Sequence, residues 1–330
     1  MKICDLETQS LGELKPLIAK CAYIPFKEYG LEEHLGVNYV IEKLSDVLSQ
    51  GGFILVAKEQ GETVGLISLK RLEWDSRHFG TEISKVTHLL ALGDYFKSVN
   101  IKKELISNLL ARCYSNLLLH INARIDKEDL SSAHALELNS FRLMDVLVTY
   151  SFDFRKQTRV DMKTQYRIRR YRQNEIYELA EIARACFRDN PVVTDRFHAD
   201  PTLPKEKSGE VYVKWLMDSF QNQCSQVLVA ELDGTPVGFN LCAINKLVAS
   251  KLPLRLGTID LTAVKPSERG KLIATSLLNA SLDWFTNKVD IVESGGQVSN
   301  YAIQRAWSKV GFKPVRSQCT FHWSVLPDSR

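Results

Sequence analysis

The sequence predicts an α/β protein built from two tandem domains, each a mixed sheet flanked by helices. Three observations predict this fold: an internal repeat, short alternating apolar runs joined by turn dipeptides, and longer runs with helical periodicity. A chain of 330 residues is long enough for two ordinary domains with a core in each. A hydrophobic content of 45% and a charged content of 25% are typical of a soluble globular enzyme.

The first part of the repeat is a pair of hairpin patterns. Residues 54–65, ILVAKEQGETVG, align without a gap to residues 227–238, VLVAELDGTPVG. In each segment an alternating apolar strand leads to a dipeptide, Gln60-Gly61 or Asp233-Gly234, and then to a returning strand. The glycine in each dipeptide favours a tight hairpin turn.

The second part of the repeat lies further along each half. Residues 136–152, LELNSFRLMDVLVTYSF, parallel residues 307–323, WSKVGFKPVRSQCTFHW, and each segment predicts the end of a helix followed by two strands. The offset is 173 residues for the hairpins and 171 residues here, which indicates two copies of one fold. The predicted domains are residues 1–155 and 156–330, with the basic stretch 155–171 joining their cores. Two unrelated α/β domains with generic hairpins are the alternative.

The second copy shows its elements in order. Residues 174–187 and 210–220 predict helices, and residues 256–264 predict a strand. The next helix has an apolar face made by Ile273, Leu277, Ala280 and Trp284. A strand at residues 288–294 follows, and terminal strands close the domain. Between them Asn300 caps a helix whose apolar face is formed by Ile303, Ala306, Trp307 and Val310.

Charge and hydropathy exclude several classes of protein. The net charge of +4 is small, so it indicates no nucleic-acid partner and is compatible with a small anionic ligand. No apolar run approaches the ~18–20 residues that a membrane span requires. The first ten residues, MKICDLETQS, have no apolar signal core. We therefore expect a cytoplasmic protein without a membrane partner.

Cysteine and histidine positions predict neither a disulfide framework nor a metal site. The seven histidines form no close ligand pair, and no two cysteines have a C-x-x-C spacing. We expect reduced thiols, as in cytosolic proteins, and no metal. The cysteines concerned are Cys4, Cys21, Cys113, Cys186, Cys224, Cys242 and Cys319.

A candidate anion site lies in residues 261–278, LTAVKPSERGKLIATSLL, where a strand runs into a basic turn and then a helix. The first N–H groups of a helix have no intrahelical partner, and the helix dipole favours negative charge there. Arg269 and Lys271 add positive charge, and Gly270 permits a close approach of backbone to ligand. We call residues 269–275 the cradle. An ordinary turn with solvated basic side chains is the alternative.

The order of these elements resembles the GNAT superfamily of acetyltransferases, whose Val-x-Pro-x-x-Arg-Gly-x-Gly-x-Gly/Ala turn wraps the pyrophosphate of acetyl-coenzyme A. The family also has a later Asn-x-x-Ala-x-x-x-Tyr-x-x-x-Gly-Phe helix that flanks the pantetheine and the thioester. The chain departs from this pattern at Leu272, Ile303 and Trp307. We expect Leu272 to adopt helical φ and ψ at the helix start. The matching residues are Val264, Pro266, Arg269, Gly270, Ala274, Asn300, Gly311 and Phe312.

The resemblance implies acetyl-coenzyme A as the acyl donor and the second half as the catalytic one. Asn300 would contact the pantetheine, cap its helix, or do both. A backbone N–H of the strand would hold the oxyanion, because GNAT strands splay or bulge at this point. The implied coenzyme-binding residues are Leu261, Thr262, Ala263, Val264, Arg269, Gly270, Lys271, Leu272, Ile273, Ala274, Thr275 and Asn300.

Two positions bear on proton transfer. Asp260, beside the expected thioester, is the best candidate base, although a structural hydrogen bond is its alternative role. Trp307 occupies the catalytic position where the family carries a tyrosine that protonates the leaving thiolate. An indole N–H is too weak an acid for that step. Water, the substrate or Tyr301 would then supply the proton, or the protein would not be a catalyst.

Three segments carry a narrower resemblance over most of the chain: WDSRHFG from residue 74, INARIDKEDL from residue 121 and DRFHADP from residue 195. They are similar to the family of TDP-fucosamine acetyltransferases. That family couples a degenerate first GNAT-like half to a working second half, and acetylates the amino group of a nucleotide-linked sugar. Here too the first half lacks an Arg-Gly-x-Gly turn, so the resemblance implies that it completes the substrate cleft. The implied substrate-binding residues are Trp74 and Phe79, within WDSRHFG, and Arg196 and His198, within DRFHADP.

The sequence therefore predicts an N-acyltransferase that transfers an acetyl group to the amine of a nucleotide-activated deoxysugar used for surface polysaccharide. Another small amine or a protein N-terminus is the alternative acceptor within the same class. A GNAT-like binding or scaffold protein without catalysis is the alternative from another class. A homodimer is left open by the sequence.

Overall fold

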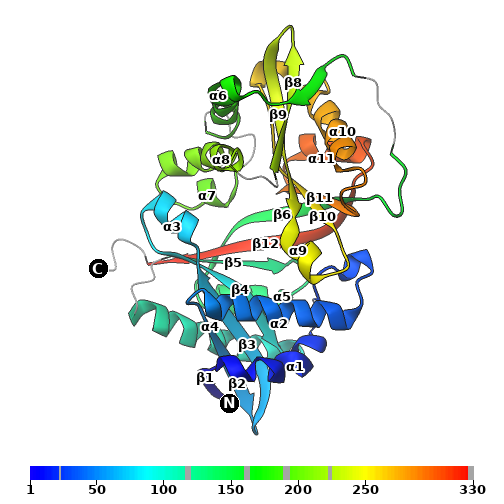
Figure 1. The fold of residues 1–330 in the computed structure, drawn as a ribbon. Helices are drawn as coiled ribbons and strands as arrows, with labels where there is room; N and C mark the ends of the chain where they lie inside the picture. Colours follow the sequence, from blue (N-terminus) through cyan, green and yellow to red (C-terminus); the bar gives the residue numbers. More distant parts are fainter. Residues whose placement is uncertain (22–23, 116–119, 160–163, 189–193, 222–224, 326–330) are drawn as a thin grey trace. The chain divides into compact units, whose positions relative to one another are not determined.

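The computed structural model describes residues 1–21, 24–115, 120–159, 164–188, 194–221 and 225–325 (Figure 1). The chain forms two compact units, and each is described by itself. Unit 1 comprises Met1–Asp145 and Gln318–Arg330, and unit 2 comprises Val146–Ser317. Each unit has a mixed sheet flanked by helices, which confirms the predicted fold class.

The sheet of unit 1 has the strand order β1-β2-β3-β4-β5-β12. Among its described strands β4 and β5 pair in parallel, and the other pairs are antiparallel. The elements are β1 Lys2–Asp5, η1 Thr8–Leu14, α1 Lys15–Ala19, η2 Lys27–Tyr29, α2 Glu33–Ser49, β2 Phe53–Glu59, β3 Glu62–Arg71, α3 Glu73–Phe79, β4 Ile83–Ala91, α4 Tyr95–Ser115, β5 His120–Asp126, α5 Leu130–Leu138 and the second part of β12 Lys313–Ser324.

The sheet of unit 2 has the matching order β7-β8-β9-β10-β11-β6, and here β10 and β11 form the parallel pair. The elements are the second part of β6 Arg142–Asp153, β7 Arg167–Arg170, η3 Gln173–Glu175, α6 Ile176–Phe187, α7 Arg196–Ala199, α8 Lys205–Ser219, β8 Ser225–Leu232, β9 Thr235–Asn245, α9 Lys246–Lys251, β10 Leu256–Val264, η4 Pro266–Glu268, α10 Ile273–Phe285, β11 Ile291–Gln297 and α11 Tyr301–Lys309.

The two units contain the same hairpin turns and helix caps at the predicted offsets. The hairpin turns Gln60-Gly61 and Asp233-Gly234 both have positive φ at each position, 50° and 88° in the first and 49° and 81° in the second. Two successive residues with positive φ make the turn whose twist matches that of a hairpin. Asp129 and Asn300 each cap the following helix with a side-chain oxygen, and each accepts from the N–H three residues on.

The last strand of each half is exchanged. β6, at the end of the first half of the sequence, pairs with β11 of unit 2, and β12, at the end of the second half, pairs with β5 of unit 1. Figure 1 shows the red strand β12 beside β5. The compact units therefore differ from the predicted division at residues 155 and 156 by this exchange of strands.

β6 and β12 also correct the expectation of two terminal strands in each half. Each is one continuous strand of 12 residues. The physical reason is that residues 142–153 hold no glycine or proline, and the single proline of residues 313–324 stands at the start. Nothing in either segment breaks the ladder.

Two apolar clusters cover the two faces of the unit 2 sheet. Leu228 and Ala230 pack with α10 and α11, whereas Val227 and Val229 pack with α6 and α8, as the two-residue period of a strand requires. Burial of each such aliphatic side chain contributes about 1.5–3 kcal/mol. The sheet therefore holds β10 rigidly between two helical layers.

The pairing of β10 changes at Asp260. The parallel ladder with β11 runs from Leu256 to Ile259 and ends there, and the register with β9 shifts between Ile259 and Leu261. Asp260 is thus a bulge residue, and consequently Ile259 and Leu261 pack on opposite faces of the sheet. We call the region where β10 leaves β11 the splay. The predicted strand irregularity is confirmed.

Candidate active site

At the splay, β10 and β11 no longer pair with each other, so each strand has a side that faces no partner strand among the described residues. The N–H of Lys265 donates to the carbonyl of Val237 at 2.9 Å, so the N–H groups of Ala263 and Leu261 also point to β9. Those of Thr262 and Val264 alternate to the other side, where β11 has separated from β10. On β11, Gly295 and Gly296 carry no side chain at this level. Among the described residues, the N–H groups of Thr262 and Val264 therefore face away from β9 with no partner strand, and Trp307 of α11 packs against Gly296.

The side chains of the predicted strand residues are not all available to a ligand. Leu261 and Ala263 are buried in the cluster under α6 and α8, so they would act through the backbone alone. Ile273 and Thr275 are likewise buried, at the start of α10, and Ala274 is half-buried there. Arg269, Gly270, Lys271 and Leu272 are exposed.

The backbone of the cradle corrects one expectation. Leu272 has φ 63° and ψ 13°, in the left-handed region, and does not adopt the helical φ and ψ expected of it. Gly270 also has positive φ, 81°, and a Cβ there would meet nothing within 4 Å. The turn needs left-handed backbone at both positions, so leucine is strained where the family pattern has glycine, by about 1–2 kcal/mol.

The N-terminus of α10 is open to an anion. Leu272 occupies the N-cap position, and no side chain of the described residues caps the helix. The first N–H groups of α10 therefore lack a protein acceptor. In the loop before the helix, Gly270 and Leu272 have left-handed backbone and Arg269 is extended.

Side chains around the cradle hold its shape. The hydroxyl of Tyr166 donates to the carbonyl of Lys271 at 2.9 Å, and Lys271 Nζ pairs with Glu268 at 2.9 Å. The sulfur of Cys186 donates to the carbonyl of Val264 at 3.1 Å. Burial raises the pKa of the Cys186 thiol, and a hydrogen bond with Arg269 opposes that rise, which places the Arg269 side chain at the end of β10. Tyr166 belongs to the stretch that the sequence had indicated only as a linker.

The equivalent connection in unit 1 is closed. β4 and α4 are joined by three residues (92–94), whereas eight residues (265–272) join β10 and α10. Asp94 caps α4, since its carboxylate accepts from the N–H of Lys97 at 2.9 Å. A carboxylate of the protein thus holds the position that an anion would take.

Asp260 stands at the splay with its side chain exposed to solvent. Enough protein surrounds the carboxyl for desolvation to raise its pKa, and a hydrogen bond with Thr258 only partly opposes this effect. A carboxyl with a raised pKa binds a proton more readily, which suits a base but does not by itself assign that role.

Asn300, Tyr301 and Trp307, at the start of α11 or within it, lie in different surroundings. Asn300 caps the helix by accepting from the N–H of Ile303 at 3.3 Å, which confirms the cap. Trp307 is 1% exposed, and its Nε1 has no hydrogen-bond partner among the described residues. Tyr301 is 64% exposed at the first position of α11. The indole is therefore a core side chain beside the splay.

A polar cluster surrounds His198 in unit 2. His198 Nδ1 lies 2.8 Å from Asp195 Oδ2, and the hydroxyl of Tyr212 donates to the same oxygen at 2.8 Å. The hydrogen bond to Asp195 raises the pKa of His198. Burial alone would raise the pKa of Asp195, but its hydrogen bonds from His198 and Tyr212 lower it. Arg196 stacks over the ring of Phe197, 4.2 Å from its centroid.

The other two predicted substrate residues lie on α3 in unit 1. Trp74 is half-buried and stacks on His78 with ring centroids 5.2 Å apart. Phe79 is 3% exposed and lies edge-on to the ring of His78, with centroids 4.8 Å apart. Its surface is therefore not available to a ligand in this conformation.

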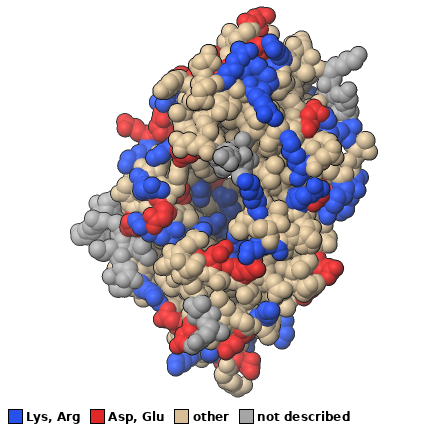
Figure 2. Space-filling model, viewed as in Figure 1, with Lys and Arg blue, Asp and Glu red and all other residues tan. Residues whose placement is uncertain are grey.

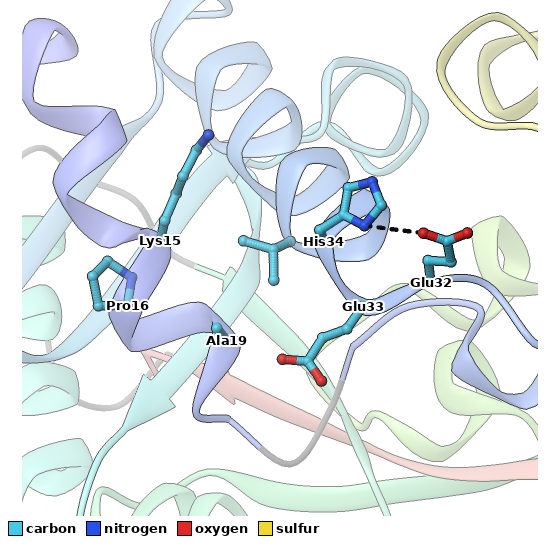
Figure 3. A pocket seen from close by; sticks show the side chains of 7 residues that line it. Lys15, Pro16, Ala19, Glu32, Glu33 and His34 are labelled. Carbon is cyan, nitrogen blue, oxygen red and sulfur yellow. Dashed lines mark ion pairs between the residues drawn. The ribbon is translucent and has the colours of Figure 1, made fainter.

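A hollow in unit 1 lies between α1 and the start of α2 (Figure 3). Its volume is about 680 Å³, and the ion pair drawn there joins His34 Nδ1 to Glu32 at 3.3 Å between two exposed side chains. It contains none of the residues that the acyl-transfer chemistry needs. It is lined by Lys15, Pro16, Ala19, Glu32, Glu33, His34 and Val37.

Figure 2 shows Lys and Arg side chains interspersed with Asp and Glu over the visible face. Arg167 and Arg169 of β7 and the following Arg172 all pair with Glu231, on the neighbouring β8. These cations are thus neutralised in part by a carboxylate of the same unit.

The cysteines of the described residues are free thiols, as expected, and Cys224 lies outside those residues.

The spacing of the histidines in the sequence did not predict one pair that the fold brings together. The exchanged strand β12 brings His322 beside His120 of β5, with ring centroids 4.7 Å apart. No helix of the described residues is long and apolar enough to cross a membrane.

Comparison with known proteins agrees with this geometry. Residues 176–312 match the acetyltransferase (GNAT) family. A sequence comparison with curated proteins found no match. Among solved structures, a GCN5-related N-acetyltransferase from Sphaerobacter thermophilus is similar at 14% identity and a TM-score of 0.65, covering 99% of this chain and 96% of that chain.

Two further solved structures are similar to nearly all of this chain. A tandem GNAT protein from the clavulanic acid biosynthesis pathway has 13% identity and a TM-score of 0.57, covering 99% of both chains. A GCN5-related glucosamine N-acetyltransferase region of a fungal multi-domain β-N-acetylglucosaminidase has 14% identity and a TM-score of 0.62, covering 98% of this chain and 38% of that chain.

The fold is therefore that of tandem GNAT proteins, and a GNAT acetyltransferase domain occupies residues 176–312. The family match of residues 176–312 and the similar folds support an N-acetyltransferase activity of the GNAT type. Proteins of this family generally take the acyl group from acetyl-coenzyme A and transfer it to an amine.

Proposed function

We propose that unit 2 binds acetyl-coenzyme A and acetylates the amino group of a nucleotide-linked amino sugar. The observation that carries the proposal is the contrast between the two helix N-termini. α10 presents uncapped N–H groups behind an exposed basic turn, whereas α4 is capped by Asp94. Of these two equivalent helix starts, that of α10 is therefore the one open to an anion, and it follows the strand that forms the splay.

The cradle and the strand N–H groups would bind different parts of the coenzyme. The cradle would hold the pyrophosphate, and the N–H groups of Thr262 and Val264 would hold the pantetheine arm and the thioester carbonyl. The coenzyme supplies an activated acyl thioester. The oxyanion that forms during acyl transfer would be stabilised by a strand N–H that needs no reorganisation.

Sequence resemblance and one similar solved structure support the proposed class of acceptor, a nucleotide-linked amino sugar. The segment around Trp74 and the segment around Arg196 and His198 resemble nucleotide-amino-sugar acetyltransferases in sequence, and one similar solved structure is named for glucosamine acetylation. Arg196 would pair with a phosphate of the nucleotide. A free amine of a sugar loses its proton near neutral pH, so water or Asp260 would serve as the base.

Titration calorimetry with acetyl-coenzyme A tests the donor site. We expect one site per chain. Gly270→Ala should weaken binding because alanine resists φ 81°, although the added Cβ would clash with nothing. Asp94→Ala in unit 1 is the matched control and should leave the affinity unchanged. Two equivalent sites, or a loss of affinity in the control, would overturn the assignment.

Release of free thiol with candidate amines tests the acceptor. We expect the highest kcat/KM with a nucleotide-linked amino sugar, followed by the free amino sugar. Arg196→Ala should raise KM for the nucleotide-linked substrate alone, whereas Arg170→Ala should raise neither KM. Preference for a peptide N-terminus or a simple alkylamine would replace the proposed substrate by the alternative acceptor.

A further inference from the structure

The departing thiolate lacks an evident proton donor on α11. Trp307 stands where a tyrosine would be expected, but an indole N–H does not transfer its proton to a thiolate. Trp307 is also 1% exposed, and Tyr301 is directed to solvent with 64% of its surface accessible. Another acid beside the splay belongs to β6.

Tyr150 of β6 lies at the level where the splay opens. In the sheet register Ile259 of β10 is opposite Ser294 of β11, and Ser294 is opposite Tyr150 of β6. Directly opposed residues of neighbouring strands carry their side chains on the same face. Ile259 packs with α10 and α11, so Tyr150 also faces these helices, and Ile259 is the last residue of β10 that pairs with β11.

The contacts of Tyr150 support its ring and leave its hydroxyl weakly held. The ring lies against Trp307, with centroids 5.1 Å apart and an interplanar angle of 36°. The hydroxyl is 3.4 Å from Gln304 Oε1, which is a long hydrogen bond. The side chain is half-buried. A hydroxyl held in this way can donate to a nearby ligand atom in place of Gln304.

We infer that Tyr150 protonates the sulfur of the leaving thiol, in place of the tyrosine that Trp307 replaces. The acceptor amine forms the C–N bond to the thioester carbonyl carbon, and the C–S bond then breaks with its electron pair going to sulfur. The phenolic proton passes to that sulfur and gives the free thiol. The proton lost by the amine returns through water to the phenolate, so the step balances. The inference rests on the proposed function.

Tyr150→Phe tests the inference, because phenylalanine retains the ring that packs on Trp307. We expect kcat to fall by about 10²-fold while the dissociation constant of acetyl-coenzyme A stays within twofold. Tyr301→Phe is the matched control and should leave both quantities unchanged. Thermal unfolding of the two variants should coincide with that of the unaltered chain.

A binding measurement gives a second readout that needs no turnover. Calorimetry compares coenzyme A with desulfo-coenzyme A, which lacks only the sulfur. The unaltered chain should prefer coenzyme A by about five- to tenfold, the size of one hydrogen bond, and Tyr150→Phe should abolish this preference. A kcat for Tyr150→Phe within threefold of the unaltered value, or a preference that survives the substitution, would overturn the inference. A chain that binds no coenzyme A at all would instead overturn the proposed function.

Discussion

Phe321, in the last strand of the chain, lies directly opposite Ala123 of β5. Both side chains are buried, at 2% and 1% exposure, in the apolar core of unit 1. Phe312, earlier in the same C-terminal segment, is equally buried but belongs to the core of unit 2. The boundary between the two units falls between Phe312 and Phe321, at Ser317 and Gln318 within β12.

Phe321→Ala should destabilise unit 1 although residue 321 belongs to the second half of the sequence. Loss of a buried phenyl group costs about 3–5 kcal/mol. Hydrogen exchange should accelerate in β2–β5, whereas the matched variant Phe312→Ala should accelerate exchange in β8–β11. Faster exchange in β8–β11 of the first variant would contradict the exchange of strands.

Leu272→Gly should stabilise the chain by about 1 kcal/mol, because glycine adopts positive φ without strain. Ser140→Gly is the control, since Ser140 has the same φ of 63° in unit 1. Denaturant unfolding should detect both gains, but tighter binding of acetyl-coenzyme A should follow only the change at residue 272. A loss of stability in Leu272→Gly would show that its side chain makes contacts worth more than the strain.

Asp260→Asn should raise the melting temperature at pH 8 and leave it unchanged at pH 4. Desolvation raises the pKa of Asp260 in the folded state, so its charged form opposes folding, and stability falls as pH rises through the folded pKa. A lower kcat in the stabilised variant would indicate that the carboxyl is retained for function. A lower melting temperature at pH 8 would favour the structural hydrogen bond instead.

His198→Gln should destabilise the chain more at pH 5.5 than at pH 9. The hydrogen bond to Asp195 raises the pKa of His198 in the folded state. The resulting stabilisation is fully present below the unfolded pKa and is lost as pH rises through the folded pKa. We expect a loss of about 1–2 kcal/mol at pH 5.5 from denaturant unfolding. His34→Gln, at an exposed pair with Glu32, is the control and should change nothing at either pH.

Trp307→Phe should keep turnover within about tenfold, or ~1.4 kcal/mol of barrier. Any loss would arise from packing, because the indole is enclosed and supports the ring of Tyr150. Steady-state kinetics with coenzyme titration measures both effects. A thousandfold loss with unchanged affinity for acetyl-coenzyme A would give the indole a chemical role.

Local patterns predicted much of unit 2. The strand at residues 256–264 has the bounds expected, and Asn300 caps the helix that follows it. Both depend on interactions within a few residues, which a single sequence displays. The hairpin turns were predictable for the same reason, since glycine at the second turn position fixes the backbone.

The remaining features depend on partners distant in the sequence. Nothing near Tyr150 indicates that it joins the sheet of unit 2, because strand exchange is decided by pairing with β11. The left-handed backbone of Leu272 was missed because leucine itself disfavours it, and the surrounding loop imposes it. The capping of α4 by Asp94 likewise depends on the short connection between β4 and α4. The turn motif before α10 does not predict that connection.

The exchange of β6 and β12 also sets an order of events during synthesis. β1–β5 leave the ribosome early, but the strand that completes their sheet emerges last. An emerging chain normally folds its first domain while the rest is still being made. Here β5 has no neighbouring strand on the edge that pairs with β12 until residues 318–324 have been made. The sheet of unit 1 is therefore completed no earlier than the sheet of unit 2. Translation of the first half of the sequence is therefore not sufficient to complete the sheet of unit 1.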